Sequence, residues 1–218
     1  MIERYQVEDM TRIWSREHTF QRWLEVEIAI AEVWHHWGQV PSESMENIRN
    51  NARFDVSRID EIEKVCKHDV IAFLTSVEEF IGPDSAYLHK GITSYDVVDT
   101  ALSLLLRESL DAVLERCHRL KVILLDQAFR YRNQPTIGRS HGIHAEPISF
   151  GGKFLIWYEE LKRNIRRLEQ ARDTISVGKI SGSVGTYIHF SPEGEAQALS
   201  RLDLTPCAIS TQIIQRDR

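Results

Sequence analysis

Two histidines lie in a short glycine-bracketed segment, Gly138–Pro147, which reads Gly-Arg-Ser-His-Gly-Ile-His-Ala-Glu-Pro. Histidine titrates near pH 6.5 when nothing perturbs it, so His141 and His144 could transfer protons at neutral pH. Glycines on both sides let the backbone approach a ligand closely. Two alternatives stay open: a hairpin loop whose histidines bind main-chain groups, and a metal site with Glu146 as a third ligand. We expect no metal, because the sequence indicates no fourth ligand.

A second polar group, Lys67-His68-Asp69, interrupts an apolar stretch that continues through Ile71 and Phe73. Alone, such a triplet is more typical of a solvated helix face than of a binding site. It becomes a candidate site because it could be combined with the histidine segment, which supplies a second imidazole.

Hydroxyl groups and glycines supply two possible anion sites. Thr93 and Ser94 lie at the start of the longest stretch without glycine or proline, and Asp96 follows them. They are expected to cap a helix, and the free N–H groups of a helix start also bind carboxylate or phosphate. The segment Lys179–Thr186 could cradle a carboxylate, although it lacks the residue order of a phosphate-binding loop, and its spacing alone favours a structural turn. Arg4-Tyr5 offers a guanidinium and a phenol for phosphate.

The elements that must position these groups are helices. Phe20, Leu24, Ile28 and Ala31 recur at helical spacing and predict an amphipathic helix that ends near Gly38. Further helices are predicted over Arg58–Ile81, over most of Ile92–Gln134, over Lys153–Val177, and from Ser191-Pro192 onward. A helix over most of the 92–134 span would be about 60 Å long. Such a helix cannot bury its apolar stripe against a small core, so we expect it to pack on other long helices, including those of partner chains.

Glycine and proline mark the connections between these helices. Asn133–Pro147 and Gly178–Gly185 are predicted to be loops, the second of them flexible. The helix at 153–177 should return antiparallel to the preceding one. The predicted fold class is therefore all-α, with a small helical amino-terminal domain over residues 1–91. Residues 92–218 would form the first part of a central domain of long helices.

Composition excludes several classes of protein. The 218 residues carry 27 Lys and Arg against 32 Asp and Glu, a formal net charge of −5, so a global positive field for nucleic acid is absent. The apolar runs are far shorter than a membrane span, and no secretory signal is visible. Cys66, Cys117 and Cys207 lie far apart, which argues against a disulfide framework and favours a reducing cytoplasm.

Taken together, these residues resemble the adenylosuccinate lyases, a family within the fumarase/aspartase superfamily. The resemblance covers the whole chain and depends on short motifs whose order and spacing are specific. These motifs are Met1-Ile-Glu-Arg-Tyr5, Lys67-His-Asp-Val70, Thr93-Ser94 with Asp96–Ala101, Gly138–Gly142 with His144–Pro147, Gly178–Gly182 with Val184–Tyr187, and Ser210–Gln212 with Gln215–Arg218.

The resemblance implies a β-elimination that releases fumarate from purine nucleotide substrates. Adenylosuccinate would give AMP, and the succinyl-aminoimidazole carboxamide ribotide would give the aminoimidazole carboxamide ribotide. A base removes a proton from the succinyl β-carbon, charge spreads into the adjacent carboxylate, and an acid protonates the departing nitrogen. The resemblance implies no metal or organic cofactor. It also implies a homotetramer whose active sites are each assembled from three subunits.

Roles for individual residues follow from the matching motifs. His141 matches the general acid that protonates the leaving nitrogen, and His68 matches a histidine that contacts the substrate and orients the reacting groups. The other implied substrate contacts are Arg4 and Tyr5 at the nucleotide end, Thr93 and Ser94 at the succinyl end, and Lys67, Asp69 and Gln212.

The chain departs from the family pattern in three ways. Lys67 stands where arginine is common, which replaces a planar fork with a point charge. Ser140 stands where threonine is typical, which keeps the hydroxyl. The chain stops at Arg218 without the family's mobile Ser-Ser-x-Met-Pro-x-Lys-x-Asn loop, whose serine is the expected base. We therefore expect an amino-terminal fragment that is inactive alone. A non-catalytic helical interaction module and another lyase of the superfamily are the competing interpretations.

Overall fold

The computed structural model describes residues 2–218, so Met1, the first residue of the Met1–Tyr5 motif, lies outside the described residues. The chain is 66% helical with only short strands, which confirms the all-α prediction. It divides into two compact units, a head unit (residues up to Glu108, together with Ile175–Arg218) and a hairpin unit (Ser109–Thr174). The domain boundary predicted near residue 91 stays a prediction. No helix within residues 2–218 is both long enough and apolar enough to cross a membrane.

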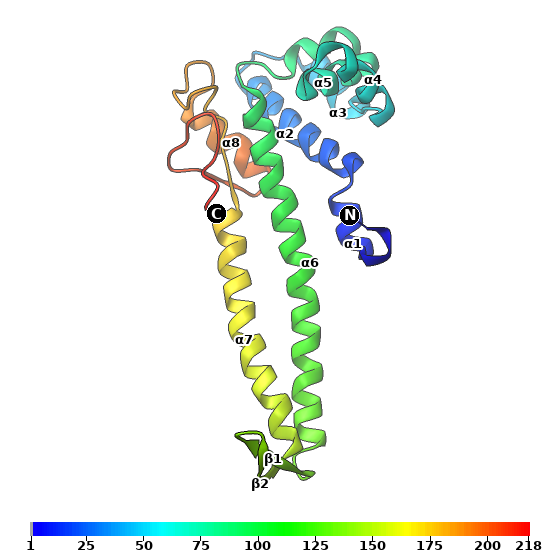
Figure 1. The fold of residues 1–218 in the computed structure, drawn as a ribbon. Coiled ribbons are helices and arrows are strands. Elements are labelled where there is room, and N and C mark those ends of the chain that lie inside the picture. Colours follow the sequence, from blue (N-terminus) through cyan, green and yellow to red (C-terminus); the bar gives the residue numbers. More distant parts are fainter. Residues whose placement is uncertain (1) are drawn as a thin grey trace. The chain divides into compact units, whose positions relative to one another are not determined.

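Five α-helices form the first part of the head unit (Figure 1). Two 3₁₀ helices accompany them, η1 (Glu3–Tyr5) and η2 (Gly82–Tyr87). The α-helices are α1 (Glu8–Ile13), α2 (Arg16–His36), α3 (Ser42–Asn51), α4 (Val56–Cys66) and α5 (Asp69–Ile81). The predicted amphipathic helix is α2, and its end at His36, just before Gly38, confirms the expected boundary.

The core of the head unit forms where α2 and α5 meet. The rings of Phe20 and Trp23 on α2 lie 5.1 Å apart edge to face, and Phe73 on α5 stacks on Phe20 at 5.7 Å. All three side chains are buried. Aromatic residues bury a large apolar area and orient one another, so this cluster fixes α5, and with it the residues at the start of α5.

The predicted helix over Arg58–Ile81 is wrong in its middle, because the chain breaks there into α4 and α5. Lys67 ends α4 in the left-handed conformation, with φ 57° and ψ 32°. His68 is extended and caps α5, accepting a hydrogen bond on Nδ1 from the Ile71 amide at 3.5 Å. The sequence carries no glycine or proline at this break, which is why helical periodicity alone did not reveal it.

The remaining part of the head unit comes from two segments, one before and one after the hairpin unit in the sequence. It includes α6 (Ser94–Arg130) up to Glu108, and α8 (Pro192–Arg201). As predicted, Ser191 caps α8, and its hydroxyl accepts a hydrogen bond from the Gly194 amide at 3.2 Å. Two short parallel strands, β3 (Val177–Gly178) and β4 (Thr205–Pro206), join the segments on either side of α8.

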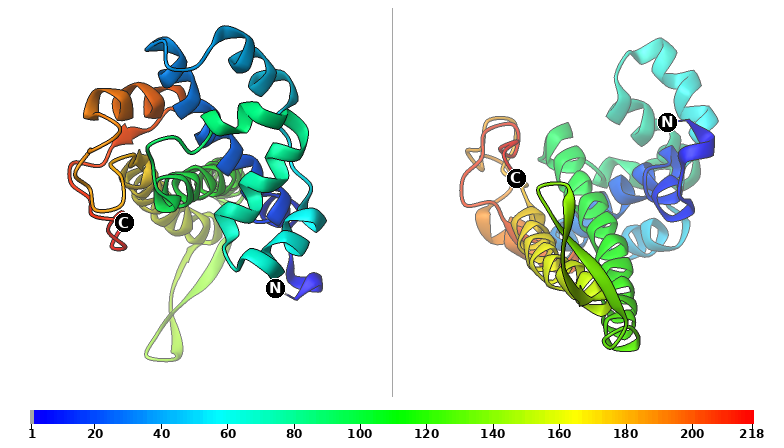
Figure 2. Two further views of the ribbon diagram at one scale, coloured as in Figure 1. Left: turned by 90° about the horizontal axis from the view of Figure 1, so that it is seen from above. Right: turned by 60° about the horizontal axis from the view of Figure 1, so that its bottom comes forward.

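The hairpin unit consists of two antiparallel helices joined by a β-hairpin, as Figures 1 and 2 show. The long helix predicted within 92–134 is α6, with 37 residues. Its partner α7 (Phe150–Ile175) returns alongside it, and Arg172 of α7 pairs with Asp111 of α6 at 2.5 Å. The segment Asn133–Pro147, predicted to be a loop, instead contains strands β1 (Pro135–Ser140) and β2 (Ile143–Ser149).

Candidate functional site

The start of α6 presents two hydroxyl groups on a tightly capped helix end. Thr93 and Ser94 are half-buried, and Asp96 is buried. The Asp96 carboxylate accepts a hydrogen bond from the Thr93 amide at 2.8 Å, while the Asp96 amide donates to the Thr93 carbonyl at 2.9 Å. This reciprocal cap orients the first turn of the helix, whose N–H groups and dipole favour an anion.

The glycine-rich segment after β3 is attached directly to this helix start. Lys179 is completely buried, and its ammonium group forms an ion pair with Asp96 and donates to the Gly182 carbonyl at 3.0 Å. The Gly182 amide in turn donates to Asp96 at 3.2 Å. The first part of the segment predicted as a loop, Lys179–Ser181, is thus buried against α6.

The same segment also contacts the carboxyl-terminal stretch that carries Gln212. The hydroxyls of Ser181 and Ser210 are hydrogen-bonded at 2.8 Å. A Cβ added at Gly185 would lie 2.2 Å from the Ser210 carbonyl oxygen, so only glycine permits this approach of the two backbones. Gln212, two residues further on, has an exposed side chain. The structure therefore brings together the predicted succinyl contacts, the glycine-rich segment and the Ser210–Gln212 motif.

Buried polar residues on α6 and α8 form hydrogen bonds with the glycine-rich segment. Thr100 exchanges hydrogen bonds with the Lys179 backbone, each at 3.1 Å. Glu195 on α8 accepts from the Ile180 amide at 2.6 Å and from the Tyr187 hydroxyl at 2.8 Å. Burial raises the pKa of Glu195, although these two hydrogen bonds oppose it. Burial and the bond to Glu195 raise the pKa of Tyr187, so the phenol stays a donor.

The sequence did not single out two residues of this region as site residues. Its pattern places Asp96 only in the first turn of a capped helix, and Lys179 only in a structural turn. An acidic residue three positions after a capping threonine is a recognisable signal for Asp96. Lys179 offers no such signal, because lysine is almost never fully buried without a partner, and the partner lies 83 residues away in the chain.

The Lys67-His68-Asp69 triplet lies in the head unit at the junction of α4 and α5, where all three residues are exposed. Nδ1 of His68 lies 3.4 Å from an Asp69 carboxylate oxygen. Asp69 also accepts a hydrogen bond from the Val70 amide at 2.8 Å. Within residues 2–218, no hydrogen bond or ion pair links these three side chains to Thr93. The triplet is thus a separate, accessible polar group.

Arg4 and Tyr5 lie in η1, and both are exposed. The Arg4 guanidinium sits over the Tyr5 ring, 4.9 Å from its centre. A cation over an aromatic face is attracted by the ring quadrupole, so the two side chains form one unit that presents a positive charge beside an aromatic surface.

His141 occupies the tip of the β-hairpin, in the hairpin unit. His141 and Gly142 both have positive φ values, 49° and 76°, and they connect Ser140 to its strand partner Ile143. Two consecutive left-handed residues in a two-residue hairpin loop define a type I′ turn, which matches the twist of the strands. The exposed imidazole is therefore carried by a defined turn rather than by an irregular loop.

The metal interpretation of this segment gains no support from the structure. Across residues 2–218, no group of three His, Cys, Asp or Glu side chains is arranged so that it could hold a metal ion. His141 lies in the turn, while His144 and Glu146 lie on β2.

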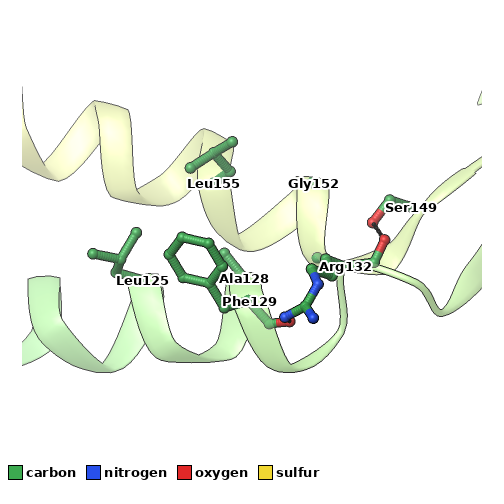
Figure 3. Close-up of a pocket in the computed structure, with 8 residues that line it drawn as sticks. Leu125, Ala128, Phe129, Arg132, Ser149, Gly152 and Leu155 are labelled. Carbon is green, nitrogen blue, oxygen red and sulfur yellow. Dashed lines mark hydrogen bonds between the residues drawn. The ribbon is translucent and has the colours of Figure 1, made fainter.

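The hairpin unit contains a cavity between the facing ends of α6 and α7 (Figure 3). It has a volume of about 310 Å³. Leu125, Phe129 and Leu155 face it, with Arg132 and Ser149 at one end. This mostly apolar lining is unlike the polar region of the head unit.

Comparisons with known protein sequences match this chain to lyases. A family model described as "Lyase" matches residues 3–218. The adenylosuccinate lyase of Thermotoga maritima is 48% identical over 218 residues, and that of Bacillus subtilis is 47% identical over the same length. Each match covers 100% of this chain and 51% of the relative. The chain therefore spans about half the length of these curated relatives.

Solved structures show the same architecture. A 3-carboxy-cis,cis-muconate lactonizing enzyme from Pseudomonas putida matches with a TM-score of 0.87 and 27% identity, over 98% of this chain and 50% of that one. A fumarate lyase from a Mesorhizobium species matches with a TM-score of 0.84 and 25% identity, over 93% of this chain and 49% of that one. The helical fold is thus that of the fumarase/aspartase type.

Proposed function

Since this chain belongs to the lyase family, we propose that it is the amino-terminal part of an adenylosuccinate lyase. The whole enzyme would release fumarate from adenylosuccinate, giving AMP, and from the succinyl-aminoimidazole carboxamide ribotide. Identity to curated adenylosuccinate lyases along the whole chain supports this substrate class over those of the other structural relatives.

The observation that carries the proposal is the hydrogen-bonded region at the start of α6. Thr93 and Ser94 offer hydroxyls at the positive end of a 37-residue helix, beside the glycine-rich segment and the stretch leading to Gln212. Such an arrangement is suited to a carboxylate, and the succinyl group carries two. Donors that are oriented before the reaction would stabilise the charge that grows on the carboxylate after proton removal.

His141 is the proposed general acid. During elimination the Cβ–H bond breaks first and its electrons move into the adjacent carboxylate. The electrons then return to form the Cα=Cβ double bond of fumarate while the Cα–N bond breaks, and the His141 imidazolium protonates the departing nitrogen. The exposed turn supports this role, because it presents the imidazole to a ligand. His68 is proposed to contact the substrate and orient the reacting groups, with Lys67 and Asp69 as neighbouring contacts.

The purine nucleotide end of the substrate is assigned to Arg4 and Tyr5. Their stacked guanidinium and phenol would contact the phosphate with a positive charge and a hydroxyl donor. The base is expected from the serine loop of the whole enzyme, which this chain does not contain. We therefore expect the 218-residue chain alone to release no fumarate.

We propose that the whole enzyme is a cytoplasmic homotetramer with each site built from several subunits. Large apolar side chains are exposed along both helices of the hairpin unit, among them Val122, Ile123, Phe129, Ile156 and Trp157. Exposed apolar stripes on long helices favour packing against other long helices. The three free cysteines agree with a reducing compartment.

The test uses protein expressed from the whole open reading frame, with AMP and fumarate measured after addition of adenylosuccinate. Argininosuccinate, fumarate hydration and 3-carboxy-cis,cis-muconate are assayed in parallel. Turnover of one of these, without turnover of adenylosuccinate, would refute the substrate assignment. Failure to turn over any of them, with no thermal protection by AMP, would favour a non-catalytic helical module.

The acid role is tested with His141→Asn, because asparagine tolerates the left-handed conformation and Asn-Gly is a favoured type I′ turn. The turn is kept while the acid is lost, and kcat should fall by roughly 10² to 10⁴. His118→Asn, a change at an exposed histidine on α6 of the same unit, is the control and should leave kcat unchanged. A wild-type rate in the His141 variant would remove that residue from the role.

A further inference from the structure

The ion pair between Asp96 and Lys179 is the most deeply buried charged contact described in the head unit. Both side chains have an exposed fraction of 0%. Removing two charges from water costs several kcal/mol per ion, so a buried pair is often no more stable than a well-packed apolar pair. Fold stability alone therefore gives little reason for a lysine and an aspartate at these positions.

Asp96 and Lys179 also form hydrogen bonds with the backbone of the two segments that they join. Asp96 accepts hydrogen bonds from the amides of Thr93, at 2.8 Å, and Gly182, at 3.2 Å. Lys179 donates a further hydrogen bond to the Gly182 carbonyl at 3.0 Å. The ion pair thus binds the amide and the carbonyl of Gly182, and it also binds the amide of Thr93 at the start of α6.

The backbone at Gly178 and Lys179 is also held tightly in place. Gly178, which precedes Lys179, lies so close to Leu199 and Thr100 that an added Cβ would be 2.3 Å from Leu199. The Lys179 amide and carbonyl are both hydrogen-bonded to Thr100. The lysine side chain is therefore fixed at its backbone as well as at its ammonium group.

We propose that Asp96 and Lys179 are a positioning pair that sets the separation between the hydroxyls at the start of α6 and the glycine-rich segment 180–185. This inference rests on the proposed function, which supplies the ligand, a dicarboxylate succinyl group. Neither residue is proposed to touch the substrate. A displacement of about 1 Å in a positioning group can cost roughly 10² in rate, so loss of the pair should impair binding and turnover.

The experiment compares two variants of the whole enzyme. Lys179→Met leaves the Asp96 charge buried and unpaired, so it should lower Tm, raise KM at least tenfold and reduce kcat/KM by roughly 10². Asp96→Asn/Lys179→Met removes both charges and keeps an oxygen that can accept from the Thr93 amide. Its Tm should recover toward the wild-type value, whereas KM should stay raised because the Lys179 bond to Gly182 is still missing.

The control is Ser76→Ala. Ser76 is buried in the same unit, and its hydroxyl accepts a hydrogen bond from the Asp55 amide at 3.1 Å. This variant should lower Tm without raising KM. If the double variant recovers KM together with Tm, the pair is only structural and the inference is wrong. If the Ser76 variant raises KM as much as Lys179→Met does, the KM effect is not specific and the inference is also wrong.

A readout independent of activity separates this inference from the proposed function. Hydrogen exchange of the amides of residues 93–96 and 180–185 should accelerate in the double variant, even where Tm has recovered. Unchanged exchange in these two segments would overturn the positioning role. Absence of adenylosuccinate turnover by the wild-type enzyme would instead refute the proposed function, and the exchange measurement would still decide the role of the pair.

Discussion

The carboxylate of Glu108 lies 2.7 Å from Nε2 of His18 and connects α6 to the start of α2. The same carboxylate accepts hydrogen bonds from Arg12 at 2.9 Å and from Arg22 at 2.7 Å. Partial burial by itself would raise the pKa of Glu108, but these hydrogen bonds outweigh it and lower the pKa to about 2. One acidic side chain thus holds three residues of the amino-terminal segment.

This pairing predicts an acid-dependent loss of stability. Because the folded pKa of Glu108 lies below its unfolded value near 4.3, its charge stabilises the fold above that pH, and the stabilisation is lost as the pH falls toward 2. Glu108→Gln should reduce the free energy of unfolding at pH 7 by roughly 1–2 kcal/mol and flatten its dependence between about pH 4.5 and 2. Urea unfolding followed by tryptophan fluorescence measures both effects.

Glu79→Gln is the control variant for the Glu108→Gln measurement. Glu79 pairs with Arg58 at 2.9 Å, but both side chains are more than 40% exposed, at 42% and 46%. An exposed pair contributes little, so this change should cost clearly less stability than Glu108→Gln does. An equal loss in the two variants would contradict the special role assigned to Glu108.

A second pH dependence is expected on the alkaline side. Glu27 is completely buried, and its carboxylate accepts hydrogen bonds from the His89 amide at 2.7 Å and lies 2.6 Å from Nδ1 of the His89 ring. Burial alone would lower the pKa of His89, but Glu27 raises it above the usual 6.5. The stabilisation is therefore complete below about pH 6.5 and is lost as the pH rises through the folded pKa.

The check is the free energy of unfolding of the wild type and of Glu27→Gln between about pH 6 and 9. The wild type should lose stability across this range more steeply than the variant, in which the histidine faces a neutral amide. Parallel curves for the two proteins would show that Glu27 does not set the protonation of His89.

Adjacent glycines at the start of α7 provide a matched pair of variants. A Cβ at Gly151 would lie 2.3 Å from the Ala128 carbonyl oxygen, whereas a Cβ at Gly152 would meet nothing within 4 Å. Gly151→Ala should therefore separate α6 from α7 locally and cost about 1–3 kcal/mol. Gly152→Ala should be neutral or stabilise by up to about 1 kcal/mol through its helix propensity. Thermal unfolding decides, and similar Tm values for the two variants would contradict the packing described.

The turn at the tip of the hairpin predicts an effect on turnover. Gly142 has a φ of 76°, which alanine adopts only with strain, so Gly142→Ala should distort the turn that carries His141. In the whole enzyme we expect kcat to fall at least tenfold, whereas Gly38→Ala should leave it unchanged. Gly38 has a similar φ of 72° and likewise open space around it, so the strain is matched. Equal kcat values in steady-state assays would refute the link between turn geometry and turnover.

Local patterns predicted most of the helices correctly. The apolar spacing of Phe20 to Ala31 and the following Gly38 defined α2, and the stretch without glycine or proline after Ile92 defined α6. They failed at the break between α4 and α5, where Lys67 adopts a left-handed conformation without any glycine to mark it. They also failed at the hairpin, because His-Gly is not among the usual type I′ turn pairs.

The order of residue types along the chain is enough to predict the helical class and to locate the polar motifs. Those properties depend on neighbouring residues, through helical periodicity and capping. Three-dimensional contacts were needed to show that Lys179 is buried against Asp96 and that Ser181 is hydrogen-bonded to Ser210. These contacts place the start of α6 beside both segments. Burial and charge pairing depend on residues far apart in the chain, and no local pattern of residue types records which distant partner removes a side chain from water.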